Sequence, residues 1–305
     1  MTADRSYVIV GASLAGAKAA EAMRDAGFDG SVVLVGDERE LPYERPPLSK
    51  GYLLGKDARE KAFVHEEQWY ADHDVSLQLG ATVTGLHRSS HEIELAGGDR
   101  IAYDKLLLAT GSSPRKLQVP GADLTGVHSL RRIGDSDTLR EVFAGGGSLV
   151  VVGAGWIGLE VTAAARHYGV EVTVIEPQPA PLYAALGREV GDIFAALHRD
   201  HGVDVRTATG VKSFEGSDGR VTGVTTSSGD LVAADAVVIG ELGLGAEVRQ
   251  VPQIGRRLAE AQRLGFTRAI VPASTPDVAG IELFRVRDLA GARSVAGLSD
   301  EARIG

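Results

Sequence analysis

The sequence predicts an α/β fold made of two tandem units, followed by a short α/β segment at the C-terminal end. In each unit a short apolar run ends at a glycine and leads into a helical apolar pattern, first at residues 7–27 and again at 148–169. The spacing between the two turn glycines, Gly11 and Gly153, is far longer than a solenoid repeat. The repetition therefore indicates two domains rather than a repeat array.

Three regions follow from this pattern: residues 1–113, residues 114–240 and residues 241–305. In the first we expect strands at 7–10, 32–35 and 106–109, and an antiparallel pair formed by 75–79 and 92–95. In the second we expect strands at 148–152, 172–175, 203–205, 221–226 and 236–239. The third contains a basic helix pattern around residues 256–264 and an apolar run at 269–271.

The composition excludes several classes of function. The 305 residues carry a net charge of −9, so a nucleic-acid partner is not expected. No apolar run is long enough to cross a bilayer and no signal-peptide core is present, which indicates a cytoplasmic protein. The chain has no cysteine, which excludes thiolate metal sites and a redox-active cysteine pair. The histidines show no metal-ligand spacing, so no metal site is expected, and His198 and His201 are interpreted as surface residues.

The turn of the second unit carries the strongest motif. Gly153, Gly155 and Gly158 form G-x-G-x-x-G directly between a strand and a helix, the arrangement that cradles a dinucleotide pyrophosphate in a Rossmann-like fold. Glu176 ends the next strand, where a carboxylate accepts hydrogen bonds from ribose hydroxyls and repels a 2′-phosphate. The motif predicts NAD binding and a preference for NADH over NADPH. A glycine-rich turn without a ligand is the alternative.

The first unit carries a variant of the same turn. Its candidate binding residues are Gly11, Ser13, Ala15 and Gly16, with Ser13 where the middle glycine is usual, and Asp37 follows the second strand in the ribose-binding place. The run 106–111 ends in Thr110 and Gly111, at the point where such chains cross between domains. Two dinucleotide sites in tandem favour hydride transfer from a nicotinamide to a flavin. A turn that binds nothing remains the alternative for this unit.

Residues 8–53 resemble the FAD-dependent, NADH-using ferredoxin reductases of the pyridine nucleotide-disulfide oxidoreductase superfamily, a group that includes putidaredoxin and rhodocoxin reductases and the reductase components of aromatic dioxygenases. The segment YERPPLSK, residues 43–50, is the most distinctive part, and SLRRIGDSD, residues 129–137, is similar as well. The resemblance covers about residues 5–240. It implies FAD and NAD as cofactors, NADH as the electron donor and a ferredoxin-type [2Fe–2S] protein as the acceptor.

The resemblance also implies roles for individual residues. Asp37 would hold the FAD adenosine ribose, and Val83 and Arg131 match further FAD-contacting positions. Lys50 would lie near the flavin ring, and Glu160 would pair with it beside the nicotinamide. A cation in that place would stabilise the negative charge of a reduced flavin. A solvated lysine and an ordinary helix residue are the structural alternatives for these two.

The reductase pattern stops near residue 240. The family continues with a strand ending in Ala-Gly-Asp and then a C-terminal domain, and neither is found, so the FAD domain is expected to be incomplete. Residues 240–293 instead resemble the Lon-protease-like C-terminal domain of the bacterial DNA-repair ATPase RadA (Sms), without that protein's zinc finger or ATPase loop. The expected function is therefore an NADH-dependent FAD-containing ferredoxin reductase, with activity impaired by the break. The alternatives are a non-catalytic NAD-binding or interaction protein and, third, DNA binding through residues 241–305.

Overall fold

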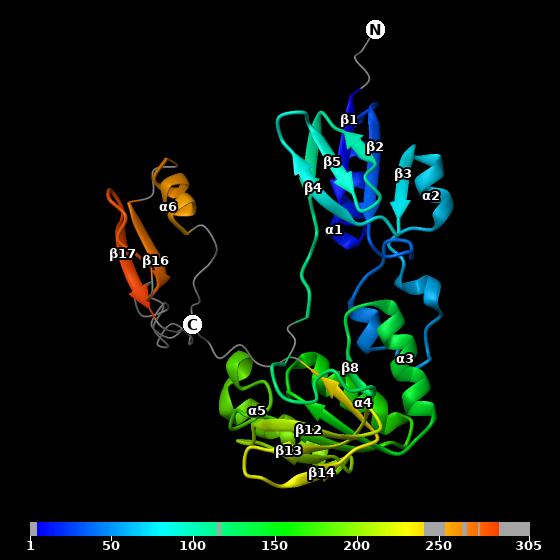
Figure 1. Ribbon diagram of the computed structural model, residues 1–305, viewed down its shortest axis with the longest axis vertical. Coiled ribbons are helices and arrows are strands. Elements are labelled where there is room, and N and C mark those ends of the chain that lie inside the picture. The colour runs from blue at the N-terminus through cyan, green and yellow to red at the C-terminus, as the bar shows by residue number, and fades with distance from the viewer. Residues whose placement is uncertain (1–4, 115–116, 241–253, 264–266, 274, 287–305) are drawn as a thin grey trace, which may run out of the picture.

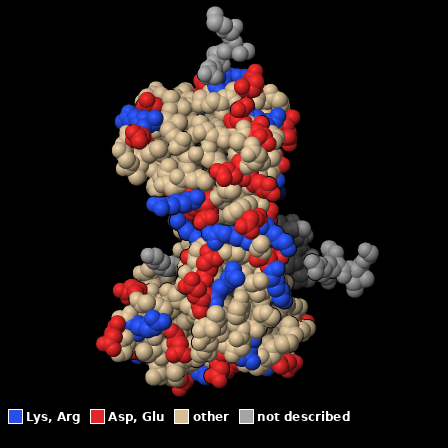
Figure 2. Space-filling model, turned by 90° about the vertical axis from the view of Figure 1, so that its right-hand side faces the viewer, with Lys and Arg blue, Asp and Glu red and all other residues tan. Residues whose placement is uncertain are grey.

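The computed structural model describes residues 5–114, 117–240, 254–263, 267–273 and 275–286 (Figure 1). Figure 1 shows two lobes, each built around a parallel sheet, with β1 to β5 in the upper lobe and β8 to β14 in the lower one. Acidic and basic side chains are interspersed on the face shown in Figure 2, and the basic ones gather between the lobes. The α/β class and the two sheet-bearing units are as predicted.

The upper lobe is a four-stranded parallel sheet in the order β3-β2-β1-β7. Its strands are β1 (Ser6–Val10), β2 (Ser31–Gly36), β3 (Val75–Leu79) and β7 (Lys105–Leu108), with helices α1 (Leu14–Asp25) and α2 (Glu67–Asp72) between them. Ile9, Leu34 and Val75 pack with Tyr70 of α2 in the core on one side of the sheet. Apolar side chains on both faces of the central strands explain their continuous hydrophobic runs.

One predicted strand pair is wrong. Residues 75–79 and 92–95 do not pair with each other, because β3 joins the parallel sheet beside β2, with Val75 opposite Val32. The second strand, β5 (Glu92–Leu95), lies between β4 (Val83–His87) and β6 (Arg100–Ala102) in a separate antiparallel sheet. Both segments alternate in polarity as antiparallel strands do, so their own sequence does not identify their partners; burial against Tyr70 decides for β3.

The lower lobe contains a five-stranded parallel sheet in the order β11-β10-β9-β15-β8. Its elements are β8 (Val127–Ser129), α3 (Ile133–Ala144), β9 (Ser148–Val152), α4 (Trp156–His167), β10 (Glu171–Ile175), α5 (Tyr183–Asp200), β11 (Asp204–Arg206) and β15 (Ala236–Ile239). An antiparallel sheet of β12 (Val211–Ser217), β13 (Arg220–Thr226) and β14 (Leu231–Ala233) packs on one side. Helix α5 is interrupted at Gly187, whose φ is +76°.

The proline-rich segment 42–63 belongs to the first unit in sequence but packs on the second unit. It forms two short 3-10 helices, η1 (Pro46–Ser49) and η2 (Arg59–Ala62). Its buried side chains join one core with α3 and α4: Tyr43, Leu48, Tyr52, Leu53 and Ala62 lie with Ile133, Leu139 and Phe143. Tyr168 at the end of α4 also donates a hydrogen bond to the Leu53 carbonyl, at 3.3 Å. This segment therefore ties the two lobes together.

The described part of the C-terminal segment contains α6 (Ile254–Arg263) and a parallel strand pair, β16 (Arg268–Pro272) and β17 (Glu282–Val286). Leu258, Val271 and Ile281 form its small core. The helix and the first strand agree with the sequence pattern, whereas the second strand is not among the predicted ones. Residues 241–253 and 287–305, which complete the predicted third region, lie outside the described residues.

His198 is not the surface residue that the sequence pattern suggests. It lies on the inner face of α5 together with Gly191 and Ala195 and is 9% exposed, whereas His201 after the helix end is exposed. Burial, with a smaller contribution from nearby His201, lowers the pKa of His198 below its ordinary value. Helical spacing alone places these two residues on similar faces, and the packing of α5 decides which of them is covered.

The close contact at the second glycine turn predicts that alanine is destabilising at one helical glycine, Gly158, and tolerated at another, Gly134. A Cβ atom on Gly158 would lie 2.1 Å from the Gly153 carbonyl oxygen, whereas one on exposed Gly134 in α3 would meet nothing within 4 Å. Because a backbone atom cannot move aside cheaply, Gly158→Ala should destabilise the protein by about 1–3 kcal/mol or more. Gly134→Ala should be neutral or stabilising by up to about 1 kcal/mol. Urea unfolding at constant temperature measures both, and equal effects would contradict the close approach.

The buried His198 predicts a loss of stability in acid. Since its pKa is lowered in the folded state, the unfolded chain binds more protons below about pH 6.5, and the free energy of unfolding falls as the pH decreases through that value. His198→Gln should lose less stability than the wild type between neutral pH and pH ~5. The same substitution at exposed His167 should keep the wild-type loss. Parallel curves for the wild type and His198→Gln would show that His198 is not the cause.

Candidate functional site

The first turn is closed by direct contact between backbone segments. Gly11 has a φ of +122°, and a Cβ atom there would lie 2.0 Å from the Ala109 carbonyl oxygen. A Cβ atom on Gly16 would lie 2.0 Å from the Gly11 carbonyl oxygen, so α1 packs directly on the turn. Ser13, by contrast, has a φ of −131° at the start of α1. That extended conformation suits any residue, which explains why serine replaces glycine there.

The second turn repeats this geometry. Gly153 has a φ of +97°, and Gly158 approaches it as Gly16 approaches Gly11. Gly155 starts α4 with a φ of −76°, matching Ser13 in position. A Cβ atom on Gly240, directly after β15, would lie 2.8 Å from the Gly153 carbonyl oxygen, as Ala109 after β7 lies against Gly11. Each turn is thus covered by the residue that follows the neighbouring parallel strand.

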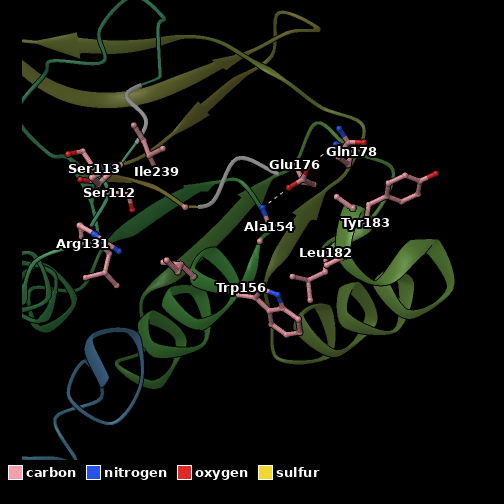
Figure 3. Close-up of a pocket in the computed structure, with 18 residues that line it drawn as sticks. Ser112, Ser113, Arg131, Ala154, Trp156, Glu176, Gln178, Leu182, Tyr183 and Ile239 are labelled. Carbon is pink, nitrogen blue, oxygen red and sulfur yellow. Dashed lines mark hydrogen bonds between the residues drawn. The ribbon is translucent and has the colours of Figure 1, made fainter. Parts of the chain in front are cut away.

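A cavity of about 540 Å³ opens beside the second turn (Figure 3). Of the predicted residues, Gly155, Glu176 and Arg131 line it, whereas Gly153 and Gly158 shape the turn beneath it. Sequence reasoning did not select the apolar residues of the wall, which include Trp156, Leu182 and Tyr183. The cavity is large enough for a small-molecule ligand.

Glu176 lies at the end of β10 and is 3% exposed. Its two carboxylate oxygens accept hydrogen bonds from the Ala154 backbone N–H at 2.6 Å and from the Gln178 backbone N–H at 2.8 Å. Burial raises the pKa of this carboxyl group, and the two backbone donors oppose that rise. The carboxyl group therefore fixes the glycine turn against the next strand, and it does so from the wall of the cavity.

A second cavity, of about 470 Å³, opens beside the first turn. Most of the residues predicted for this unit line it: Gly11, Ser13, Ala15, Asp37, Thr110, Gly111 and Arg131. The predicted residues Gly16, Lys50 and Val83 do not; Gly16 lies behind the turn, and Val83 packs in a hydrophobic cluster with Val8 and Ile93. Asp37 is half-exposed and forms an ion pair with Arg132.

Four charged residues of this cavity were not among the predicted site residues: Lys18, Glu38, Arg45 and Arg132. Glu38 accepts hydrogen bonds from Arg45, at 2.7 Å, and from the Tyr43 hydroxyl. Arg45 also donates to the Arg131 carbonyl at 2.6 Å. Burial and the bond to Glu38 raise the pKa of Tyr43, which stays a neutral donor. Lys18 lies on α1, and Arg132 pairs with Asp37. Arg45 and Arg132 lie in the two segments quoted in the sequence analysis, YERPPLSK and SLRRIGDSD, and Lys18 and Glu38 lie in the wider stretch 8–53.

The two cavities share part of their walls. Ser112, Ser113, Pro114 and Arg131 line both of them. The strand β7 leads into residues 109–114, so the chain that leaves the first turn forms the boundary between the cavities. Ligands bound at the two turns would therefore meet at this shared wall, which the sequence located only as a crossing between domains.

Lys50 and Glu160 form an ion pair between the segment 42–63, called the bridging segment because it ties the two lobes together, and α4. The Lys50 ammonium lies 2.9 Å from Glu160 Oε2, and the side chains are 54% and 27% exposed. The hydroxyl of buried Ser49 donates to the same carboxylate oxygen. Residues more than 100 positions apart in sequence are thus brought together, although neither lines one of the two cavities.

Within the described ranges, no group of three or more histidine, aspartate or glutamate side chains is arranged to hold a metal ion. No helix in the described part of the chain is long and apolar enough to cross a membrane. The arrangement that remains is two adjoining cavities, each at the N-terminal end of a helix that follows a glycine turn. Such helix ends offer free N–H groups and a positive dipole to phosphates, which suits a dinucleotide at each turn.

Comparison with known proteins agrees with this geometry. The model of the pyridine nucleotide-disulphide oxidoreductase family matches residues 5–262. Rhodocoxin reductase of Rhodococcus erythropolis is 47% identical over 235 residues, which cover 77% of this chain and 55% of that protein. The ferredoxin–NAD(+) reductase component of the biphenyl dioxygenase system of Paraburkholderia xenovorans is 37% identical over 285 residues, covering 93% of this chain and 67% of that protein.

Solved structures show the same fold. A ferredoxin reductase from Rhodopseudomonas palustris superposes with a TM-score of 0.75 at 33% identity, covering 84% of this chain and 61% of that one. The reductase in a covalent putidaredoxin reductase–putidaredoxin complex gives a TM-score of 0.76 at 32% identity, with 92% and 67% covered. The chain spans little more than half of the length of rhodocoxin reductase.

Both carboxylate oxygens of buried Glu176 accept hydrogen bonds, so replacing one of them should lower the stability of the folded protein. Glu176→Gln leaves one of the two backbone N–H groups facing an amide NH2, and this should lower the free energy of unfolding by about 1–3 kcal/mol at neutral pH. Glu171→Gln, at the exposed start of the same strand, is the matched control and should change it little. Urea unfolding of both variants tests this, and a Glu176→Gln variant as stable as the control would contradict it.

Proposed function

The chain belongs to the pyridine nucleotide-disulphide oxidoreductase family, and we propose that it passes electrons from NADH through FAD to a ferredoxin-type [2Fe–2S] protein in the cytoplasm. The observation that carries this proposal is the wall shared by the two glycine-turn cavities. Electron transfer between two dinucleotides requires them to meet, and one wall serving both cavities supplies that meeting place. The names of the similar proteins, which are ferredoxin and rhodocoxin reductases, support the choice of acceptor.

The residues at each turn fit a dinucleotide. FAD would lie against Gly11, Ser13 and Ala15, with Gly16 packed behind the turn, Asp37 at the ribose and Thr110, Gly111 and Arg131 along the shared wall. The FAD contact of Val83 rests on the family resemblance, since Val83 does not line the cavity. NAD would lie against Gly153, Gly155 and Gly158, with Glu176 at its ribose. When bound, the nicotinamide supplies a hydride, and the flavin accepts it and releases electrons singly. The lack of room for any Cβ atom at Gly11 and Gly158 supports this fit.

Lys50 and Glu160 are the proposed catalytic pair. Lys50 would hold a positive charge near the flavin, and this charge favours the reduced, negatively charged ring. Glu160 accepts hydrogen bonds from both Lys50 and Ser49, so it holds the ammonium group in one place. Ser49 and Lys50 belong to the bridging segment, and Glu160 belongs to α4. The ion pair between Lys50 and Glu160 therefore also connects the bridging segment to the NAD unit.

We further propose the domain assignment 1–113 for FAD, 114–240 for NAD and 241–305 for a segment resembling the RadA C-terminal domain. The last part rests only on the resemblance of residues 240–293 stated in the sequence analysis, and the oxidoreductase family match extends to residue 262. An alternative function is a non-catalytic NAD-binding or interaction protein. The sequence observation that favours it is the lack of an Ala-Gly-Asp segment, which in this family contacts the flavin.

The flavin spectrum of the purified protein distinguishes these functions. The protein is mixed with FAD, freed of excess by gel filtration, and titrated with NADH without oxygen. A retained flavin absorbance band that bleaches with NADH, and much less with NADPH, is expected. Lys50→Gln should retain FAD but bleach more slowly by roughly tenfold or more, because the ring loses a stabilising cation. Lys56→Gln, an exposed lysine nearby, is the control. NADH binding without any retained flavin would sink the reductase function and favour the alternative.

A further inference from the structure

The short helix η1 carries a buried hydroxyl that donates to the carboxylate of the proposed catalytic pair. Ser49 is 7% exposed, and its hydroxyl bonds Glu160 Oε2, the same oxygen that receives the Lys50 ammonium at 2.9 Å. A second acceptor, the Pro46 carbonyl, lies at the limit of a hydrogen bond, at 3.5 Å, and belongs to η1 itself. Because a buried donor without a good acceptor is unfavourable, the Ser49 proton is directed at Glu160.

The turn that carries Ser49 is held rigidly on the lower lobe. Pro46 and Pro47 open η1 and restrict the backbone angle φ at both positions. Leu48 is 2% exposed in the core that it shares with α3 and α4. The Leu48 carbonyl also accepts a hydrogen bond, at 2.9 Å, from the hydroxyl of buried Ser136 on α3. The position of the Ser49 hydroxyl is therefore set by the packing of η1.

The ion pair by itself is a weak restraint on its two side chains. The Lys50 side chain is 54% exposed and that of Glu160 is 27% exposed, and ion pairs open to water do little to hold either partner in one geometry. The hydrogen bond from Ser49 starts from a buried residue, where it is less weakened by water. Since both donors use one oxygen, a carboxylate held by Ser49 keeps that oxygen in place for Lys50.

We propose that Ser49 is a positioning residue for the Lys50–Glu160 pair. Its hydroxyl holds the Glu160 carboxylate, and the carboxylate in turn holds the ammonium group. The inference rests on the proposed function, in which the charge of Lys50 favours the reduced flavin. A charge that is already in position stabilises the reduced ring more than one that must first find its place. In this role Ser49 touches neither cofactor and acts only through Glu160 and Lys50.

The chemical reactivity of Lys50 tests the contact without any cofactor. The protein is treated briefly with the N-hydroxysuccinimide ester of acetic acid, and peptide mass spectrometry gives the acetylation rate of each lysine. Ser49→Ala should raise the rate at Lys50 by roughly two- to fivefold, the range that loosening a half-exposed ion pair allows, and leave exposed Lys56 unchanged. Glu160→Gln, which removes the charge of the partner, gives the upper reference. Equal rates at Lys50 in the wild type and Ser49→Ala overturn the proposal, whatever the flavin does.

Bleaching of bound flavin by NADH without oxygen tests the consequence. Ser49→Ala should slow bleaching at saturating NADH by roughly two- to fivefold and have no further effect in a Lys50→Gln chain, because a residue that acts only through Lys50 then has nothing to position. Ser136→Ala is the matched control and should keep the wild-type rate, since it also removes a buried hydroxyl that joins η1 to the lower lobe. Circular dichroism shows whether each variant is folded.

The possible results separate the role of Ser49 from the function on which it rests. An effect of Ser49→Ala that persists at full size in the Lys50→Gln chain overturns the positioning role and leaves the proposed function standing. An equal loss in Ser136→Ala does the same, because any loosening of η1 would then suffice. A wild type that retains FAD but is not bleached by NADH overturns the proposed function, and the acetylation rates then still decide whether Ser49 holds the pair.

Discussion

The structure depends on the contact between each glycine turn and the strand end that crosses it. Gly11 lies against Ala109, and Gly153 against Gly240, with no room for a side chain between them. Backbone hydrogen bonds fix both crossings in the same way, from Ala109 N–H to the Val10 carbonyl at 2.7 Å and from Gly240 N–H to the Val152 carbonyl at 2.9 Å. The chain direction after β7 and β15, and with it the position of each cavity, follows from these two crossings.

The bridging segment 42–63 supplies the second constraint. Its aromatic and aliphatic side chains are buried among residues of α3 and α4. The segment therefore belongs to the core of the lower lobe, although the residues before and after it in the sequence form the upper lobe. The polar residues beside this core, Arg45 with Glu38 and Lys50 with Glu160, are held in place by it. A single packed segment thus positions charged groups of the first cavity and the proposed catalytic pair.

The two cavities differ in how their charges are held. Beside the second turn, Glu176 is buried and accepts hydrogen bonds from two backbone donors. Asp37, at the matching place of the first unit, is half-exposed and paired with Arg132. A carboxylate in water exchanges partners readily, while a buried one keeps them. The carboxylate beside the second turn is therefore the more tightly held of the two.

The sequence alone determined the two units, the glycine turns and most of their strands, because apolar runs bounded by glycine specify strand–turn–helix units locally. The candidate residues at the turns followed from the same pattern. Tertiary structure alone decided that β3 pairs with β2 and not with β5, and that His198 is buried, because partner choice and burial depend on neighbours distant in sequence. It also placed Arg45 and Glu38 in the first cavity, joined the wall of that cavity to the wall of the second and left apolar side chains exposed on α5. Alternation and spacing describe one face of one element, and only packing determines what that face meets.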